Sequence, residues 1–148
     1  MIIKSNSFEK ARKEINEAKK SQTEIIFSSE NDELTRKVIE KLPIDILLIN
    51  LSDKKDFQKQ RNSGFNQVLS KIAKKNNITL GINLDEIINS KNKKEKSEII
   101  ARIKQNIRIC KKDKLKIKFV GKTQKTQKDL QALALVLGMD TKTAKNSA

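Results

Sequence analysis

The sequence predicts an α/β fold in which short buried strands alternate with helices and form a parallel sheet. Short apolar runs alternate along the chain with longer segments whose apolar residues recur every three or four positions. Five such rounds favour parallel strands joined by right-handed crossovers. A chain of 148 residues is too short for a complete barrel of eight strand–helix units. We therefore expect residues 1–148 to form a single domain. It should be a shortened or incomplete (β/α) barrel-like domain, with a flexible tail from about residue 140.

Apolar runs bounded by polar residues mark the five expected strands. They lie at 1–4, 24–28, 44–51, 78–82 and 115–120. The run at 44–51 is the most apolar of the five, which favours a central position in a sheet that is covered on both faces.

Capping residues mark the helices of the first half. Asn6, with Glu9 three residues later, is expected to cap the first helix, which runs to about Lys20. Ser29 or Asn31 is expected to cap the second helix, and Pro43 ends it. A third helix carries one continuous apolar face with the spacing i, i+3, i+4, i+7 and i+8, made by Phe65, Val68, Leu69, Ile72 and Ala73.

The second half is organised in the same way. A helical turn or two is expected at 85–90, and the charged run 91–96 is expected to be a solvated linker or a fraying helix start. The next helix buries residues spaced by three and four, namely Ile99, Ile100, Ile103, Ile107 and Cys110. A last helix at 127–137 is expected to end at Gly138.

The charge of the chain points to a polyanionic partner. The formal net charge is +15 and the isoelectric point is near 9.9. The chain has 28 Lys but only 5 Arg, together with 20 Ile and 13 Asn, which indicates that codon bias contributes to the lysine excess. The arginines are more informative, because a guanidinium group binds phosphate oxygens in a bidentate way.

Composition also excludes several classes of site. The chain has no His, so a histidine base and histidine-ligated metal sites are excluded. A lone Cys110 cannot form an intramolecular disulfide, and its apolar neighbours predict a small core residue. No apolar run reaches the length of a membrane span, and the amino terminus lacks a signal-peptide pattern. We therefore expect a cytoplasmic protein.

The first candidate site is the polar loop before the third helix. It carries Lys59, Gln60 and Arg61, followed by Ser63 as the expected helix cap and by Gly64 and Asn66. Free N–H groups at a helix start, the positive end of the helix dipole and a glycine that allows close approach favour anion binding. On the residues alone, an ordinary polar loop that caps a helix is the better interpretation.

The second candidate site is a polar helix face. Arg102, Gln105, Asn106 and Arg108 lie at helical spacing and are expected to face away from the Ile residues. Amide and guanidinium groups suit contacts to phosphates and 2′-hydroxyls, although a solvated helix face is an equal alternative. A third and weaker site comprises Lys122, Lys125 and Lys128 in the basic loop after the last strand.

Catalytic and base-stacking groups are scarce. The chain has no Walker-type loop, nucleophile elbow or dinucleotide fingerprint. The acidic residues expected at strand ends are Asp53, Asp56, Asp85 and Glu86, and pairing with nearby lysines explains them better than a magnesium site. Five Phe and no Tyr or Trp leave no evident platform for stacking bases, so RNA recognition through backbone and shape is expected.

Three ordered blocks of the chain carry a family resemblance. The first comprises Lys59-Gln60-Arg61, Gly64-Phe65-Asn66, Val68-Leu69 and 81–84, the second Ala101-Arg102 and 105–112, and the third Asp129-Leu130 and 136–139. Together they resemble ribonuclease P protein component 3 of archaea and eukaryotes. The resemblance covers roughly residues 24–144, and three ordered blocks are more specific than a single motif.

The resemblance implies a fold and a function. Members of that family adopt a barrel related to the (β/α)8 type and carry strand–helix material that this chain lacks. The implied function is a non-catalytic subunit that supports the catalytic RNA in removing the 5′ leader of precursor tRNA. Protein component 2 and the other protein subunits are the implied protein partners, and magnesium is expected in the RNA subunit rather than bound by this chain. The implied RNA-binding residues are Lys59, Gln60, Arg61, Asn66, Arg102, Gln105, Asn106, Arg108 and Lys122.

Two alternatives remain at this stage. One is a divergent metal-dependent phosphoesterase of the related barrel type, although such enzymes bind metals mainly through histidines, which this chain lacks. The other is a generic structural RNA-binding protein of the ribosomal type. An incomplete barrel is also expected to expose apolar residues of its edge strands, namely Ile2, Ile3, Ile117 and Phe119, unless a partner covers them.

Overall fold

A computed structural model describes residues 1–148 and contains one five-stranded parallel sheet. The strands are β1 (Ile2–Lys4), β2 (Ile26–Ser28), β3 (Ile46–Ile49), β4 (Thr79–Asn83) and β5 (Ile117–Val120). Their order in the sheet is the order in the chain, and every neighbouring pair is parallel. The fold is thus the α/β class that the sequence predicts, with a sheet that does not close into a full barrel.

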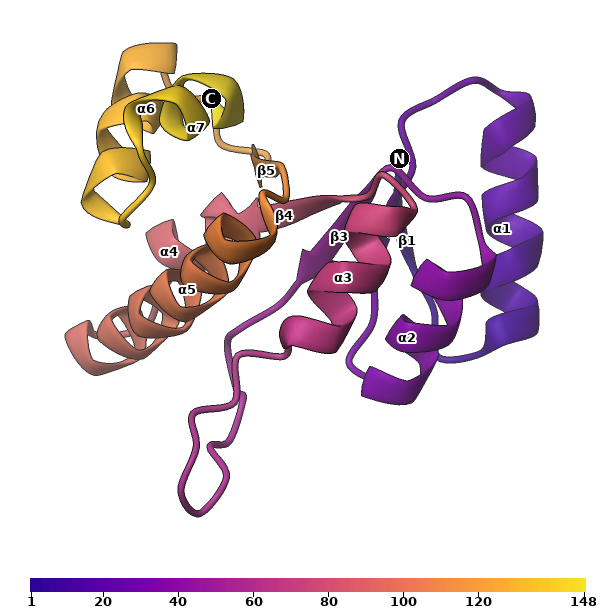
Figure 1. Cartoon of the computed structure of the whole chain (residues 1–148), viewed down its shortest axis with the longest axis horizontal. Coiled ribbons are helices and arrows are strands. Elements are labelled where there is room, and N and C mark those ends of the chain that lie inside the picture. The colour runs from indigo at the N-terminus through magenta and orange to yellow at the C-terminus, as the bar shows by residue number, and fades with distance from the viewer.

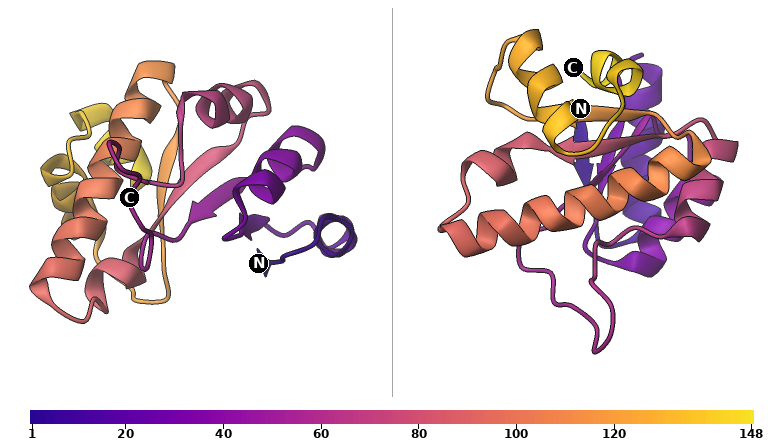
Figure 2. Two further views of the ribbon diagram at one scale, coloured as in Figure 1. Left: turned by 90° about the horizontal axis from the view of Figure 1, so that it is seen from below. Right: turned by 60° about the vertical axis from the view of Figure 1, so that its left-hand side comes forward.

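Helices follow each strand and lie around the outside of the sheet (Figure 1; Figure 2, left). They are α1 (Phe8–Lys20), α2 (Asp32–Lys41), α3 (Gln67–Lys75), α4 (Leu84–Ile88), α5 (Lys93–Asp113), α6 (Gln127–Val136) and α7 (Thr141–Ser147). A consecutive strand order with helices outside is the arrangement of a (β/α) barrel rather than of a doubly wound sheet.

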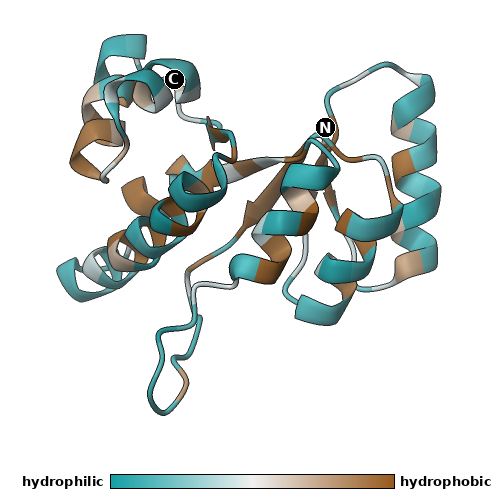
Figure 3. Ribbon diagram, in the orientation of Figure 1, coloured by the Kyte–Doolittle hydropathy of each residue, from teal (hydrophilic) through white to brown (hydrophobic).

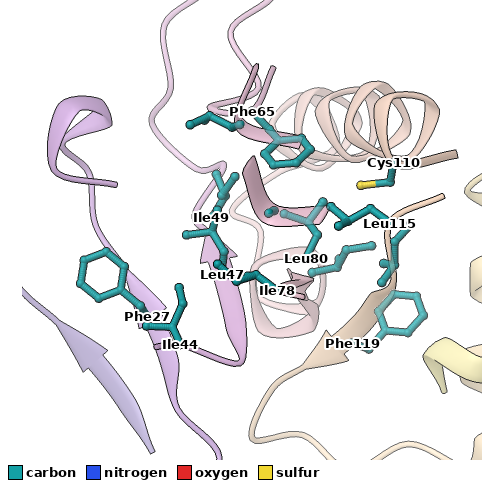
Figure 4. Packing of buried hydrophobic residues seen from close by; sticks show 14 of the residues in the cluster. Phe27, Ile44, Leu47, Ile49, Phe65, Ile78, Leu80, Cys110, Leu115 and Phe119 are labelled. Carbon is teal, nitrogen blue, oxygen red and sulfur yellow. The ribbon is translucent and has the colours of Figure 1, made fainter. Parts of the chain in front are cut away.

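The outer face of the sheet packs against these helices and forms the main core of 32 buried residues. Figure 4 shows Phe27, Leu47, Leu80 and Phe119 of this core, which come from β2, β3, β4 and β5. Burying a side chain of this size contributes on the order of 1.5–3 kcal/mol. Cys110 of α5 points into the same core, and burial raises the pKa of its thiol to about 12. The prediction of a small core residue is confirmed.

The inner face of the sheet forms a second, smaller cluster. Ile26, Ile46 and Leu48 are buried there, with Val120 packed against them. Gly81 lies in the middle of this face, and a Cβ atom there would lie 2.8 Å from Ile46 Cγ2. Only a glycine therefore lets the side chains of β3 and β5 pack closely over β4.

Local sequence explains where most helices begin and end. Asn31 accepts a hydrogen bond from the Leu34 amide and caps α2, as expected from its position. Gly138 follows the C-cap residue of α6, and its φ of +104° is a conformation that glycine adopts without strain. Two predicted caps are wrong: the residue before α1 is Ser7 rather than Asn6, and α3 is capped by Asn66 rather than by Ser63.

The end of the chain differs from the sequence expectation. Residues from about 140 were expected to be flexible because they are polar, but they form α7, capped by Asp140. This helix buries Ala144 and packs with α6 and β5.

The expected exposure of the edge strands is also corrected. Ile3 is 2% exposed, Ile117 is 5% exposed and Phe119 is 9% exposed, so of the expected residues only Ile2 lies open, at 46%. None of the helices has the length and apolar character needed to cross a lipid bilayer.

Candidate nucleic-acid interface

The first candidate site lies in a long loop that joins β3 to α3, and we call residues 50–66 the β3–α3 loop. It extends away from the rest of the molecule in Figure 1. Its far end, residues 57–60, is closed by two backbone hydrogen bonds. The Phe57 amide donates to the Gln60 carbonyl at 2.8 Å, and the Gln60 amide donates to the Phe57 carbonyl at 3.3 Å. The loop therefore has a defined hairpin-like end, which we call the tip.

Arg102 of α5 holds the base of this loop. Its Nε donates to the Asn62 carbonyl at 3.1 Å, and its Nη2 donates to the Lys54 carbonyl at 2.9 Å. The same Nη2 lies 3.1 Å from Asp56 Oδ1. The side chain is only 5% exposed. One planar guanidinium group thus ties together three points of the loop, which a lysine could not do.

Two further residues of α5 extend this contact. Gln105 donates to the Arg61 carbonyl at 3.3 Å, and Asn106 donates to the Ser63 carbonyl at 3.2 Å. The Oδ1 atom of Asn106 is buried without a hydrogen-bond partner. Three polar residues of α5 thus bind the carbonyls of residues 61–63, and α5 fixes the path of this part of the loop.

Asp56 completes the anchor from the side of the loop. Its Oδ1 accepts a hydrogen bond from the Asn62 amide at 2.9 Å. This bond lowers the pKa of Asp56 below its usual value, with the nearby Arg102 guanidinium acting in the same direction. The carboxylate therefore stays ionised and closes the loop onto itself.

Gly64 fits a tight position below this anchor. Its φ is +69°, and a Cβ atom there would lie 2.7 Å from Lys54 Cε and 2.8 Å from Ile49 Cγ2. Its amide donates to Asn62 Oδ1. The sequence interpretation gave this glycine the role of admitting an anion, whereas the close neighbours in the structure are side chains of the protein.

Two acidic residues of α4 join the neighbouring loops at the carboxyl ends of the strands. Glu86 accepts hydrogen bonds from the amides of Leu51 and Ser52, at the start of the β3–α3 loop. Asp85 accepts from the Lys122 amide at 2.9 Å, which lowers the pKa of Asp85 below its usual value. The sequence interpretation paired these acids with lysine side chains, but they bind backbone amides instead. They tie the loops after β3 and β5 to α4.

The predicted site residues fall into two groups. Lys59, Gln60 and Arg61 are exposed on the β3–α3 loop, and Arg108 and Lys122 are exposed on α5 and after β5. RNA contact by these residues stays a prediction.

The other predicted residues are engaged in internal contacts. Asn66 caps α3, because its Oδ1 accepts from the Leu69 amide at 2.9 Å. Arg102 and Asn106 are each 4% exposed, and Gln105 is half-buried against the loop. The prediction that this row faces away from the apolar side of the helix is therefore wrong for Arg102 and Asn106. They position the loop that carries the exposed cations.

One functional candidate was missed. Phe57 lies in the tip and is 60% exposed, although the sequence interpretation found no aromatic side chain available for base stacking. Figure 3 shows the β3–α3 loop as mostly hydrophilic with one hydrophobic segment. A signal was present in the sequence, since Phe57 is the only apolar residue between Ser52 and Asn62.

Nowhere in the structure do three or more acidic or thiol groups lie together in a way that would hold a metal ion.

The fold and this loop define an α/β protein whose curled parallel sheet presents a basic, anchored loop. No family model matches the chain, and no curated protein matches it. A chain in the cryo-EM structure of archaeal ribonuclease P with mature tRNA is similar over 98% of this chain, with a TM-score of 0.80 and 20% sequence identity. This chain spans 62% of the length of that chain. The two proteins share a fold.

Proposed function

We propose that this protein is a non-catalytic subunit of ribonuclease P, of the protein component 3 type. In this role it would bind the catalytic RNA and support removal of the 5′ leader from precursor tRNA. The shared fold with a chain of an archaeal ribonuclease P complex supports the proposal. The family resemblance noted in the sequence points to the same function.

One observation carries the proposal beyond the fold. The first two resembling blocks meet in space through residues that lie forty or more positions apart in the chain. Arg102 binds the Asn62 carbonyl, and Gln105 binds the Arg61 carbonyl. The loop segment of the first block and the α5 segment of the second block therefore form one structural unit, as expected if they serve one purpose.

This unit has suitable chemistry for an RNA partner. Lys55, Lys59 and Arg61 are exposed on the loop. The carboxylate of Asp56, in the same loop, is paired with Arg102 of α5. Free cations on a fixed loop would bind RNA phosphates and release counterions. By neutralising phosphates, the loop would lower the magnesium concentration that the active RNA fold needs. Protein component 2 and the other subunits are the proposed protein partners.

The test is purification of the tagged protein from cells, followed by sequencing of the RNA that remains bound after washes of increasing salt. Enrichment of ribonuclease P RNA is expected. Enrichment of ribosomal RNA in its place would favour the ribosomal alternative. Hydrolysis of a phosphodiester by the isolated protein with added metal would favour the phosphoesterase alternative. A double variant, Lys59→Ala with Arg61→Ala, should retain less RNA than the matched control Lys93→Ala with Lys94→Ala, which removes the same charge elsewhere.

A further inference from the structure

The exposure of Phe57 is unusual among the aromatic residues of this protein. Phe27 is 0% exposed, Phe65 is 5% exposed and Phe119 is 9% exposed, and Phe8 is partly buried against the core. Phe57 is 60% exposed at the tip. Leaving a phenyl ring in water forgoes the free energy of burying it, so a role outside the core is the natural explanation.

The ring is carried by a backbone that is already ordered. Two hydrogen bonds between Phe57 and Gln60 close the tip. The residue that precedes Phe57 in the chain, Asp56, is fixed by the Asn62 amide and by Arg102. A contact made by a fixed residue costs less conformational entropy on binding than one made by a mobile loop. Phe57 is therefore presented for a contact rather than left on a disordered segment.

The neighbours of Phe57 indicate the chemistry of that contact. Lys55, Lys59 and Arg61 are exposed within four residues of it, and the loop offers no second apolar side chain from Ser52 to Asn62. A protein partner that took up the ring would normally bury several apolar neighbours with it. An isolated aromatic ring among cations instead matches single-stranded nucleic acid, in which a base stacks on the ring while adjacent phosphates bind the cations.

We propose that Phe57 stacks on an unpaired nucleobase of the RNA partner, with Lys59 and Arg61 on the flanking phosphates. The inference rests on the proposed function for the identity of that RNA, and it adds a contact to a base where the cations alone would bind only backbone. The tip would therefore bind an unpaired nucleotide. It would not bind double-stranded RNA in this way, because the base faces there are stacked on each other.

The test uses the whole protein with a short single-stranded RNA, the duplex of the same sequence and ribonuclease P RNA. Phe57→Ala is expected to weaken binding of the single strand by roughly 5- to 100-fold. Phe57→Leu keeps an apolar side chain without a π face, and it should lose a similar factor. Binding of the duplex should change little in either variant. Val136→Ala is the matched control, because Val136 is 71% exposed on α6.

A spectroscopic readout is available because the chain has no Trp or Tyr. Phe57→Trp introduces a single fluorophore, which should be quenched by the single-stranded RNA and should retain wild-type affinity. Val136→Trp should not be quenched. Wild-type affinity of Phe57→Leu, or an unquenched signal from Phe57→Trp in the bound state, would overturn the inference. Each substitution lies at an exposed position, and unchanged thermal unfolding verifies that the variants are folded.

The outcomes separate this inference from the proposed function. If the wild-type protein selects ribonuclease P RNA but the Phe57 variants bind it and the single strand normally, the inference fails and the proposed function stands. If Phe57 variants lose the single strand while the wild-type protein prefers ribosomal RNA, the stacking contact stands and the proposed function fails.

Discussion

Replacing Arg102 by Ala should release the β3–α3 loop from α5. The guanidinium group makes hydrogen bonds at 2.9 to 3.1 Å to the carbonyls of Lys54 and Asn62 and to the carboxylate of Asp56. The substitution removes all of these bonds at once. It also leaves a cavity, because the Arg102 side chain is only 5% exposed. The Asn62 amide would still bind Asp56, but nothing would hold that pair against α5.

The expected magnitude follows from these contacts. A hydrogen bond from a charged group contributes about 1.5–3 kcal/mol. The ion pair must be discounted, because Asp56 is 48% exposed and can be rehydrated. The two carbonyl bonds then give a loss of about 3–6 kcal/mol in the free energy of opening the loop. This corresponds to a decrease of roughly 10²- to 10⁴-fold in amide protection.

Hydrogen exchange of the Phe57 and Gln60 amides measures this loss directly. Arg102→Lys should fall between the wild type and Arg102→Ala, because one ammonium group cannot reach all the acceptors in the geometry of a fork. Lys104→Ala is the matched control, since Lys104 is exposed on the same helix. If Arg102→Ala and Lys104→Ala leave the same protection at the tip, the loop is held by other contacts and this reasoning is refuted.

Three further predictions follow from the same loop. Gly64→Ala should destabilise the protein by about 2–4 kcal/mol, because a positive φ and close contacts to Ile49 both oppose a Cβ atom, and a melting temperature equal to that of the wild type would contradict this. The folded pKa of Asp56 lies below its usual 3.8, so its contribution is present above pH 3.8 and is lost as the pH falls through the folded pKa. Tip protection should fall in acid, and Asp56→Asn should remove that pH dependence. Arg61→Ala should lower the slope of log affinity for RNA against log salt by about 1, whereas Lys93→Ala should leave it unchanged, and equal effects would indicate diffuse charge.

Much of the fold is visible in the sequence because it depends on local patterns. Five apolar runs identify the strands, and their regular alternation with helices identifies the parallel sheet. Asn31 begins α2 and Gly138 follows the end of α6, and both act through contacts within a few residues. The polar end of the chain was misjudged, because α7 is held by packing of Ala144 against distant elements rather than by its own composition.

The site was only partly visible for a different reason. The row of Arg102 and Asn106 was expected to face solvent because the residues are polar. Their spacing contains the opposite signal, since Arg102 lies three residues after Ile99 and Asn106 three residues after Ile103, which places both on the buried side of α5. Their partners in the loop are 40 or more residues away in the chain. No local pattern could identify these contacts.

Reconstitution of precursor tRNA cleavage tests the central claim most directly. The rate of leader removal would be measured at reduced magnesium with ribonuclease P RNA, with protein component 2 present and with this protein either added or omitted. We expect leader removal at reduced magnesium only when this protein is added, and none from this protein without RNA. Equal rates with and without this protein, or cleavage by the protein alone, would contradict the account.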